Sequence, residues 1–148
     1  METNKLLIKK LTPSARCPQR ATDGSAGYDL FADIPEPVTI GPGQTALIGT
    51  GIAAALPGPE TVGLVFGRSG LGVKYGIVPA NAVGVLDSDY RGELKVGLYN
   101  HSEEAYTVQP GDRIAQMVIL PIMLPQPELA EELPDTGRAC GGWGSTGR

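Results

Sequence analysis

The sequence predicts an all-β fold, a jelly-roll-like β-barrel or sandwich followed by an extended C-terminal arm. Twenty-one glycines and 13 prolines interrupt short apolar segments along the 148 residues, which is typical of many strands joined by tight turns. Helical periodicity is nearly absent, and turn signals recur at the spacing that sandwiches and barrels show. A chain of this length forms one domain and buries roughly 70% of its unfolded surface, which is enough for a hydrophobic core.

The candidate strands follow one another along the chain with glycine- and proline-rich turns between them. They cover residues 5–11, 28–32, 38–40, 45–55, 61–66, 77–79, 83–86, 93–100, 105–108 and 113–122. Prolines interrupt residues 125–134, so a helix is not predicted there and we expect an extended arm. We therefore divide the chain into a β-barrel domain, residues 1–124, and a C-terminal arm with a glycine-rich flap, residues 125–148.

The segment 114–120 is apolar at almost every position, unlike the alternating pattern of a strand with one face in water. It is expected either to be covered on both faces or to lie against another subunit.

The charge balance and the two cysteines narrow the class of protein. A net charge of −4 and a pI of about 4.9 argue against general adhesion to nucleic acid or anionic membranes. No apolar run is long enough to span a bilayer and the first residues lack a signal-peptide pattern, so a cytoplasmic location is expected. Cys17 and Cys140 are far apart and form no C-x-x-C pair, so we interpret both as reduced thiols.

Residues 80–95 place two carboxylates and a phenol between two apolar runs. The runs at 83–86 and 94–98 predict a β-hairpin whose tip carries Asp87, Asp89 and Tyr90. A carboxylate held there can act as a general base. The alternative is that both aspartates are ordinary turn residues, because Asp favours turns through local hydrogen bonds.

Two further segments carry groups that suit a phosphate. In residues 67–72 (Gly-Arg-Ser-Gly-Leu-Gly) an arginine fork, a hydroxyl and accessible backbone N–H groups follow a strand, although the spacing is not that of a Walker loop. Gln116 lies in the apolar run and needs hydrogen-bond partners, which a ligand could supply. The alternatives are a glycine-rich turn with a surface arginine, and a glutamine satisfied by neighbouring backbone.

Near the end of the chain, in residues 138–147, glycines surround an arginine, a tryptophan, a serine and a threonine. So dense a glycine segment does not build a core, and a chain terminus is ordinarily disordered. Its composition favours a flap that orders on a ligand, with an aromatic face for a base and polar groups for phosphates.

Five segments, in order, resemble the five signature motifs of the homotrimeric dUTPases, which split dUTP into dUMP and pyrophosphate. They are residues 26–30 (Ala-Gly-Tyr-Asp-Leu), 68–71 (Arg-Ser-Gly-Leu), 81–96 (Asn-x-x-Gly-Val-Leu-Asp-x-Asp-Tyr-x-Gly-Glu-x-x-Val), 111–116 (Gly-Asp-Arg-Ile-Ala-Gln) and 138–147. Two positions depart from the pattern. Ala139 replaces a glycine and is expected to restrict the backbone to ordinary φ values, and Trp143 replaces a phenylalanine and enlarges the stacking surface.

The resemblance implies a role for each matching residue. Asp87 would orient and deprotonate the water that attacks the α-phosphorus, and Asp29 would organise the water shell of the metal and the charges around the phosphates. Mg²⁺ would be held by the triphosphate and waters, without a protein cage. The substrate-binding residues would be Arg68, Ser69, Gly70, Asn81, Val85, Leu86, Tyr90, Lys95, Gln116, Arg138, Trp143, Gly144 and Ser145. Tyr90 would pack on the sugar, where a ribose 2′-hydroxyl collides, and Trp143 would stack on uracil.

The resemblance further implies a homotrimer in which the tail of one chain caps a pocket built by its neighbours. The reaction would limit uracil incorporation into DNA and supply dUMP for thymidylate synthesis. Two alternatives stay open: a dCTP deaminase of related fold, possibly bifunctional, and a non-catalytic trimeric β-module. Neither nucleic acid nor membrane is expected as a partner.

Overall fold

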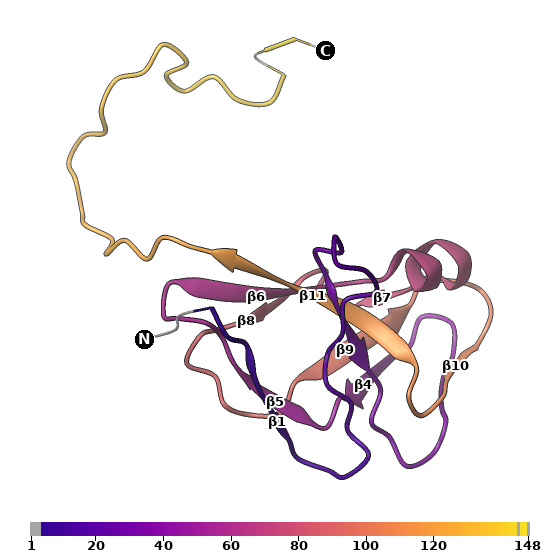
Figure 1. Cartoon of the computed structure of the whole chain (residues 1–148). Coiled ribbons are helices and arrows are strands. Elements are labelled where there is room, and N and C mark those ends of the chain that lie inside the picture. The colour runs from indigo at the N-terminus through magenta and orange to yellow at the C-terminus, as the bar shows by residue number, and fades with distance from the viewer. Residues whose placement is uncertain (1–3, 145, 148) are drawn as a thin grey trace.

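The computed structural model describes residues 4–144, 146 and 147, and nearly all of its regular structure is β-strand (Figure 1). The strands are β1 (Leu7–Lys10), β2 (Tyr28–Phe31), β3 (Val38–Ile40), β4 (Thr45–Gly49), β5 (Ile52–Ala55), β6 (Thr61–Phe66), β7 (Ile77–Pro79), β8 (Gly84–Leu86), β9 (Lys95–Asn100), β10 (Tyr106–Val108) and β11 (Arg113–Pro121). One short π-helix, η1 (Gly70–Lys74), was not predicted; it begins inside the segment expected to be a glycine-rich loop. The all-β class predicted from the sequence is confirmed.

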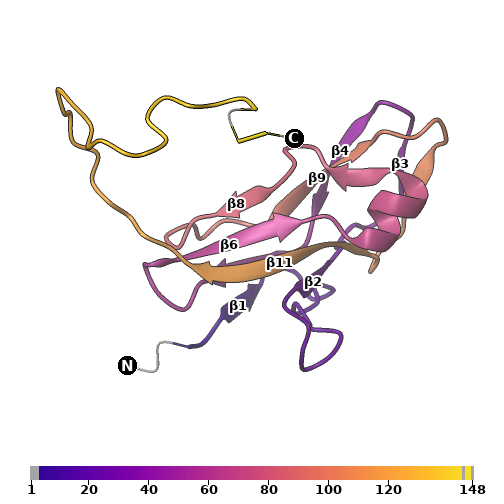
Figure 2. The same ribbon diagram turned by 90° about the horizontal axis from the view of Figure 1, so that it is seen from above.

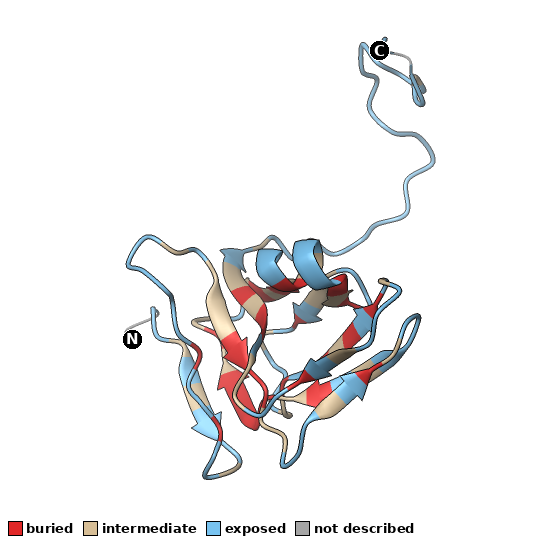
Figure 3. Ribbon diagram, turned by 90° about the vertical axis from the view of Figure 1, so that its right-hand side faces the viewer, coloured by how far each residue is buried: buried red, intermediate tan, exposed pale blue. Residues whose placement is uncertain are grey.

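The strands form four antiparallel sheets that do not close into a barrel. Their orders are β2-β11-β6-β8, β4-β9-β7, β1-β5 and β10-β3. In Figure 2 the strands of the first sheet lie side by side. The ribbon in Figure 3 is red at the buried residues. Buried side chains from all four sheets meet in one core. Leu30, Ile48, Leu98, Ile114 and Met117 are among its fully buried members.

The strand expected over residues 45–55 is two strands, because the chain turns at Thr50 and Gly51. The Thr50 hydroxyl is buried and donates a 2.6 Å hydrogen bond to the Leu94 carbonyl. Gly51 has φ +65°, and a Cβ there would overlap the Asp33 carboxylate. This turn therefore fixes the residues just before β9 to the core.

We expect Gly51→Ala to lower the thermal unfolding midpoint by about 5–10 °C. Left-handed backbone costs an L-residue about 1–2 kcal/mol, and the overlap with Asp33 adds a packing penalty of similar size. Gly58→Ala is the matched control, because a Cβ there meets no atom within 4 Å and φ is not positive. Circular dichroism melts of both variants check the prediction, and an unchanged midpoint for Gly51→Ala contradicts it.

The hairpin predicted around residues 83–98 is wrong, because its two arms pair with different neighbours. β8 pairs with β6, whereas β9 lies between β4 and β7. Pro79 of β7 faces Leu98, so both edges of β9 are occupied. Residues 80–83 connect β7 of one sheet to β8 of the other. A space opens between β8 and β9.

β11 lies at the centre of its sheet, between β2 and β6. Ile114, Ala115 and Met117 are buried, so this half of the apolar run is covered on both faces within one chain, while Leu120 stays 42% exposed. After β11 the chain leaves the body as an exposed tail (Figures 1 and 3), and residues 122–130 contain neither helix nor strand. No helix among the described residues is long and apolar enough to cross a membrane.

Candidate active site

A cavity of about 680 Å³ lies between the diverging arms β8 and β9. Its walls include six residues that the sequence singled out: Asn81, Val85, Leu86, Asp87, Tyr90 and Lys95. Two more lining residues, Leu47 of β4 and Glu93 before β9, were missed. Leu47 belongs to no motif, and Glu93 lies in the 81–96 motif but was given no role of its own. The cavity is thus built from two sheets and the loop that joins them.

Asp87 directly follows β8, at the point where the chain leaves its sheet. Its backbone carbonyl accepts a 3.2 Å hydrogen bond from the Tyr90 amide, so residues 87–90 form a turn, as the alternative interpretation held. Its carboxylate is exposed at the cavity, and within the described part of the chain no hydrogen bond reaches it. Asp89 is exposed too but does not line the cavity. Asp87 is therefore a turn residue whose side chain is free to act on a bound molecule.

A tight turn holds Asn81 against the cavity. The Ala80 amide donates to the Gly97 carbonyl at 2.8 Å, which ties this turn to β9. Ala82 has φ +64°, and the Val83 amide donates to the Asn81 carbonyl at 2.7 Å across it. Left-handed backbone is uncommon for an alanine, and strain of this kind often occurs at binding sites.

Asp29, Arg68 and Gln116 form a second cluster at one end of the β2-β11-β6 sheet. Asp29 and Phe66 both pair with Gln116, so the register places the start of the residue 67–72 loop beside Asp29. The Arg68 Nε donates to Asp29 Oδ1 at 2.9 Å, and Arg113 Nη1 approaches Oδ2 at 3.6 Å. The Gln116 Nε2 donates to the Gly67 carbonyl at 3.0 Å, so its amide nitrogen is satisfied by backbone.

Ser69 and Gly70 are exposed at the start of η1, next to this cluster. The Gly72 amide donates to the Arg68 carbonyl at 2.9 Å, which turns the backbone tightly after the arginine. Single π-helical turns occur frequently at functional sites. An arginine held in place by a carboxylate, beside a hydroxyl and an exposed glycine, can bind a phosphate group.

The tail residues form a third group, away from both others (Figure 1). Trp143 is fully exposed, and Arg138 Nε donates to the Gly141 carbonyl at 2.8 Å within the tail. Gly144 is exposed with φ +80°, and Ser145 lies outside the described residues. The expected restriction at Ala139 is wrong: its φ is +46°, so the alanine adopts the backbone that the replaced glycine favours.

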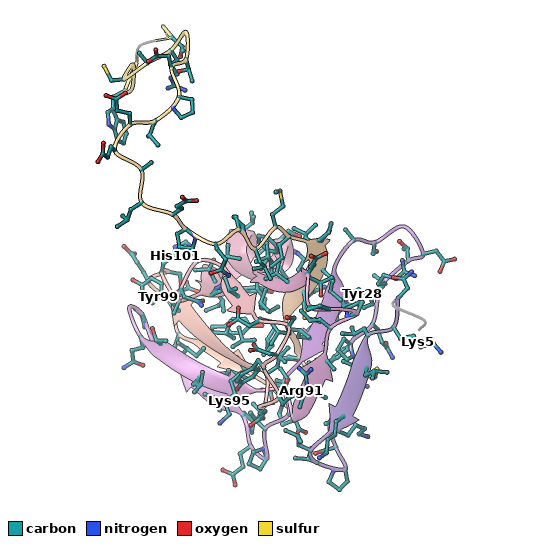
Figure 4. The ribbon with its side chains drawn as sticks, turned by 90° about the vertical axis from the view of Figure 1, so that its left-hand side faces the viewer. Lys5, Tyr28, Arg91, Lys95, Tyr99 and His101 are labelled. Carbon is teal, nitrogen blue, oxygen red and sulfur yellow. The ribbon has the colours of Figure 1, made fainter. Side chains whose placement is uncertain are left out.

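One chain does not bring the three groups into one cavity. None of Asp29, Arg68 and Gln116 lines the space between β8 and β9. In Figure 4 Tyr28, the neighbour of Asp29, lies apart from Arg91 and Lys95 at the cavity end of the molecule. The cavity residues, the arginine cluster and the tail are therefore three separate surfaces of a single chain.

The sequence profile of the dUTPase family matches residues 14–147. The deoxyuridine 5'-triphosphate nucleotidohydrolase of Idiomarina loihiensis is 51% identical over 144 residues, which cover 97% of this chain and 95% of the relative. The protein of the same name from Desulfitobacterium hafniense is 49% identical over 143 residues, with coverage of 97% and 95%.

Solved structures of dUTPases also superpose on this chain. The Staphylococcus bacteriophage 80alpha dUTPase with dUpNHpp superposes with a TM-score of 0.89 at 31% identity, over 98% of this chain and 99% of the phage chain. A dUTPase variant from phage phi11 of S. aureus, described with a coordinated structural Mg(II) ion, superposes with a TM-score of 0.81 at 28% identity, over 89% and 100%.

Proposed function

The chain belongs to the dUTPase family, and on that premise we propose which of its residues carry out the reaction. The reaction is the hydrolysis of dUTP to dUMP and pyrophosphate, which keeps uracil out of DNA and supplies dUMP for thymidylate synthesis. The observation that carries this function is identity of about 50% to dUTP nucleotidohydrolases along 97% of the chain. A dCTP deaminase or a non-catalytic module is not favoured.

Asp87 is the proposed general base. A water molecule between its carboxylate and the α-phosphorus would give its proton to Asp87 as the new P–O bond forms. The bond from the α-phosphorus to the oxygen that bridges to the β-phosphorus then breaks, and pyrophosphate leaves with that electron pair. The exposed carboxylate at the cavity supports this role, because it has no partner among the described residues to compete for the proton.

The arginine cluster is the proposed phosphate-binding surface. Arg68, Ser69, Gly70 and Gln116 would contact phosphate oxygens, and Asp29 would act through Arg68 by holding its guanidinium. Phosphoryl transfer depends mostly on alignment and on neutralising charge, so a fixed arginine contributes to both. Arg138, Gly144 and Ser145 of the tail would complete the phosphate contacts.

The cavity between β8 and β9 is the proposed nucleoside site. Asn81, Val85, Leu86 and Lys95 would form the uracil pocket, with Lys95 acting through its main chain. Tyr90 would pack on the deoxyribose, and Trp143 would stack on the base when the flap closes. Backbone groups that are paired only by uracil reject other bases, because an analogue leaves them buried and unpaired.

We propose Mg²⁺ as the cofactor, carried by the triphosphate. The described residues contain no group of three or more His, Cys, Asp and Glu side chains that could hold a metal ion by themselves. Both Asp29 oxygens face arginines, which suits contact with the ion's water shell better than direct ligation. When bound, Mg²⁺ supplies neutralisation of phosphate charge.

The proposed assembly is a homotrimer with shared sites, working in the cytoplasm. In it the body, residues 1–124, supplies the cavity and the arginine cluster, and residues 125–148 reach a site on neighbouring chains. The separation of the three groups within one chain and the exposed tail support this arrangement.

The experiment that tests the function is incubation of the purified protein with Mg²⁺ and dUTP, dCTP, dTTP or UTP separately. We expect dUMP and pyrophosphate from dUTP, and turnover of each other nucleotide at least about 100-fold lower. Ammonia released from dCTP would assign the deaminase instead, and no turnover of any nucleotide would contradict the enzyme.

A further inference from the structure

The Tyr90 ring folds back over the backbone of Gly92. A Cβ on Gly92 would overlap the Tyr90 Oη and would lie 2.6 Å from Cζ, so a residue larger than glycine fits there only if the ring is displaced. The Tyr90 hydroxyl donates a 3.1 Å hydrogen bond to the Glu93 carbonyl. Tyr90 is 47% exposed, so these contacts fix a ring that solvent would otherwise leave free to turn.

The Glu93 side chain in turn fixes the backbone on which Tyr90 rests. Its Oε1 accepts a 3.1 Å hydrogen bond from the Gly51 amide in the turn between β4 and β5. Its Oε2 lies 3.5 Å from Lys95 Nζ on the cavity wall. The neighbouring Leu94 carbonyl accepts from the buried Thr50 hydroxyl. Two hydrogen bonds to the turn at Thr50 and Gly51 therefore link the backbone under Tyr90 to the core.

We propose that Gly92 and Glu93 are positioning residues that determine how strongly the enzyme discriminates deoxyribose from ribose. The inference rests on the proposed function, in which Tyr90 packs on the sugar. A ring excludes a 2′-hydroxyl only if the ring is held in place. A ring that can move aside admits the extra oxygen at little cost in binding free energy. Gly92 holds the ring from below, and Glu93 holds the carbonyl that receives its hydroxyl.

The first test is Gly92→Ala, with kcat and KM measured for dUTP and UTP. Displacing the ring is expected to raise KM for dUTP by about 10-fold with a smaller change in kcat. The ratio of kcat/KM for dUTP to that for UTP is expected to fall by at least about 10-fold. Gly58→Ala is the control and should leave that ratio within about twofold. An unchanged ratio in Gly92→Ala would overturn the proposal.

The second test separates the hydrogen bond to Gly51 from the charge near Lys95. Glu93→Gln keeps an acceptor for the Gly51 amide and is expected to keep the dUTP:UTP ratio within about twofold. Glu93→Ala removes the acceptor and is expected to lower the ratio by about fivefold, while Glu103→Ala, an exposed control, leaves it unchanged. Equal losses in Glu93→Gln and Glu93→Ala would overturn the role of the Gly51 contact.

A third variant covers the case in which Glu93→Ala fails to fold. Tyr90→Phe keeps the ring and removes only its bond to the Glu93 carbonyl, and it is expected to lower the dUTP:UTP ratio by a few fold. If the unaltered chain hydrolyses dUTP but no variant changes the ratio, this inference fails alone. If the unaltered chain hydrolyses no nucleotide, the proposed function fails.

Discussion

Asp87→Asn is expected to lower kcat for dUTP by about 10²–10⁴-fold and to change KM by less than about threefold. The amide has the shape of the carboxylate but does not accept the proton of the attacking water. The side chain is exposed and makes no hydrogen bond to the described residues, so the substitution removes no contact that supports the fold. The loss should therefore appear in the chemical step and not in stability.

Initial rates with dUTP, together with thermal melts, check this prediction. Asp89→Asn is the matched control, because Asp89 is also exposed, lies two residues away in the same turn and does not line the cavity. We expect its kcat to stay within about twofold of the unaltered chain. More than a tenth of the activity remaining in Asp87→Asn, or an equal loss in Asp89→Asn, would show that Asp87 is not the base.

The strands were predictable because their signals are local. Glycine and proline turns bracket β3, β6 and β7, and the structure places all three within the expected bounds. The break between β4 and β5 was missed although Gly49 and Gly51 flank Thr50, because the apolar residues on both sides resemble one continuous strand. A buried hydroxyl bonded to Leu94, which follows 44 residues later, holds the chain there.

Strand pairing was the part that the sequence did not determine. The segments at 84–86 and 95–100 are close in sequence and both apolar, so a hairpin is the simplest arrangement. Each instead pairs with a strand from an earlier segment: β8 with β6, and β9 with β4. Such long-range pairing depends on how whole sheets pack, and the alternation of single residues does not encode it.

The candidate site also has one part that the sequence predicts and one part that depends on long-range contacts. Residues 80–95 lie near one another in sequence, so their gathering around one cavity was predictable. The contact of Arg68 with Asp29 depends on the β2-β11-β6 register and was visible only through the family motifs. Glu93 was missed because a glutamate beside a turn is ordinarily solvated, and only the Gly51 amide shows otherwise.

Two inactive variants are expected to restore activity when they assemble together. Deletion of residues 138–148 removes the proposed flap, and Asp87→Asn removes the proposed base, so each variant alone should lose at least about 100-fold in kcat. In trimers refolded from an equal mixture, about a quarter of the sites would combine an intact Asp87 with an intact tail from another chain. Activity should then return to about a quarter of that of the unaltered protein.

This result depends on the tail and the base coming from different chains, which makes it a direct test of the shared site. The fully exposed Trp143 has no contact with its own body that would favour capping in the same chain. Mixing the two variants without unfolding is the control and should give only the sum of their residual rates. If refolded mixtures also give only that sum, while sedimentation shows mixed trimers, each chain caps its own pocket and the shared-site arrangement is wrong.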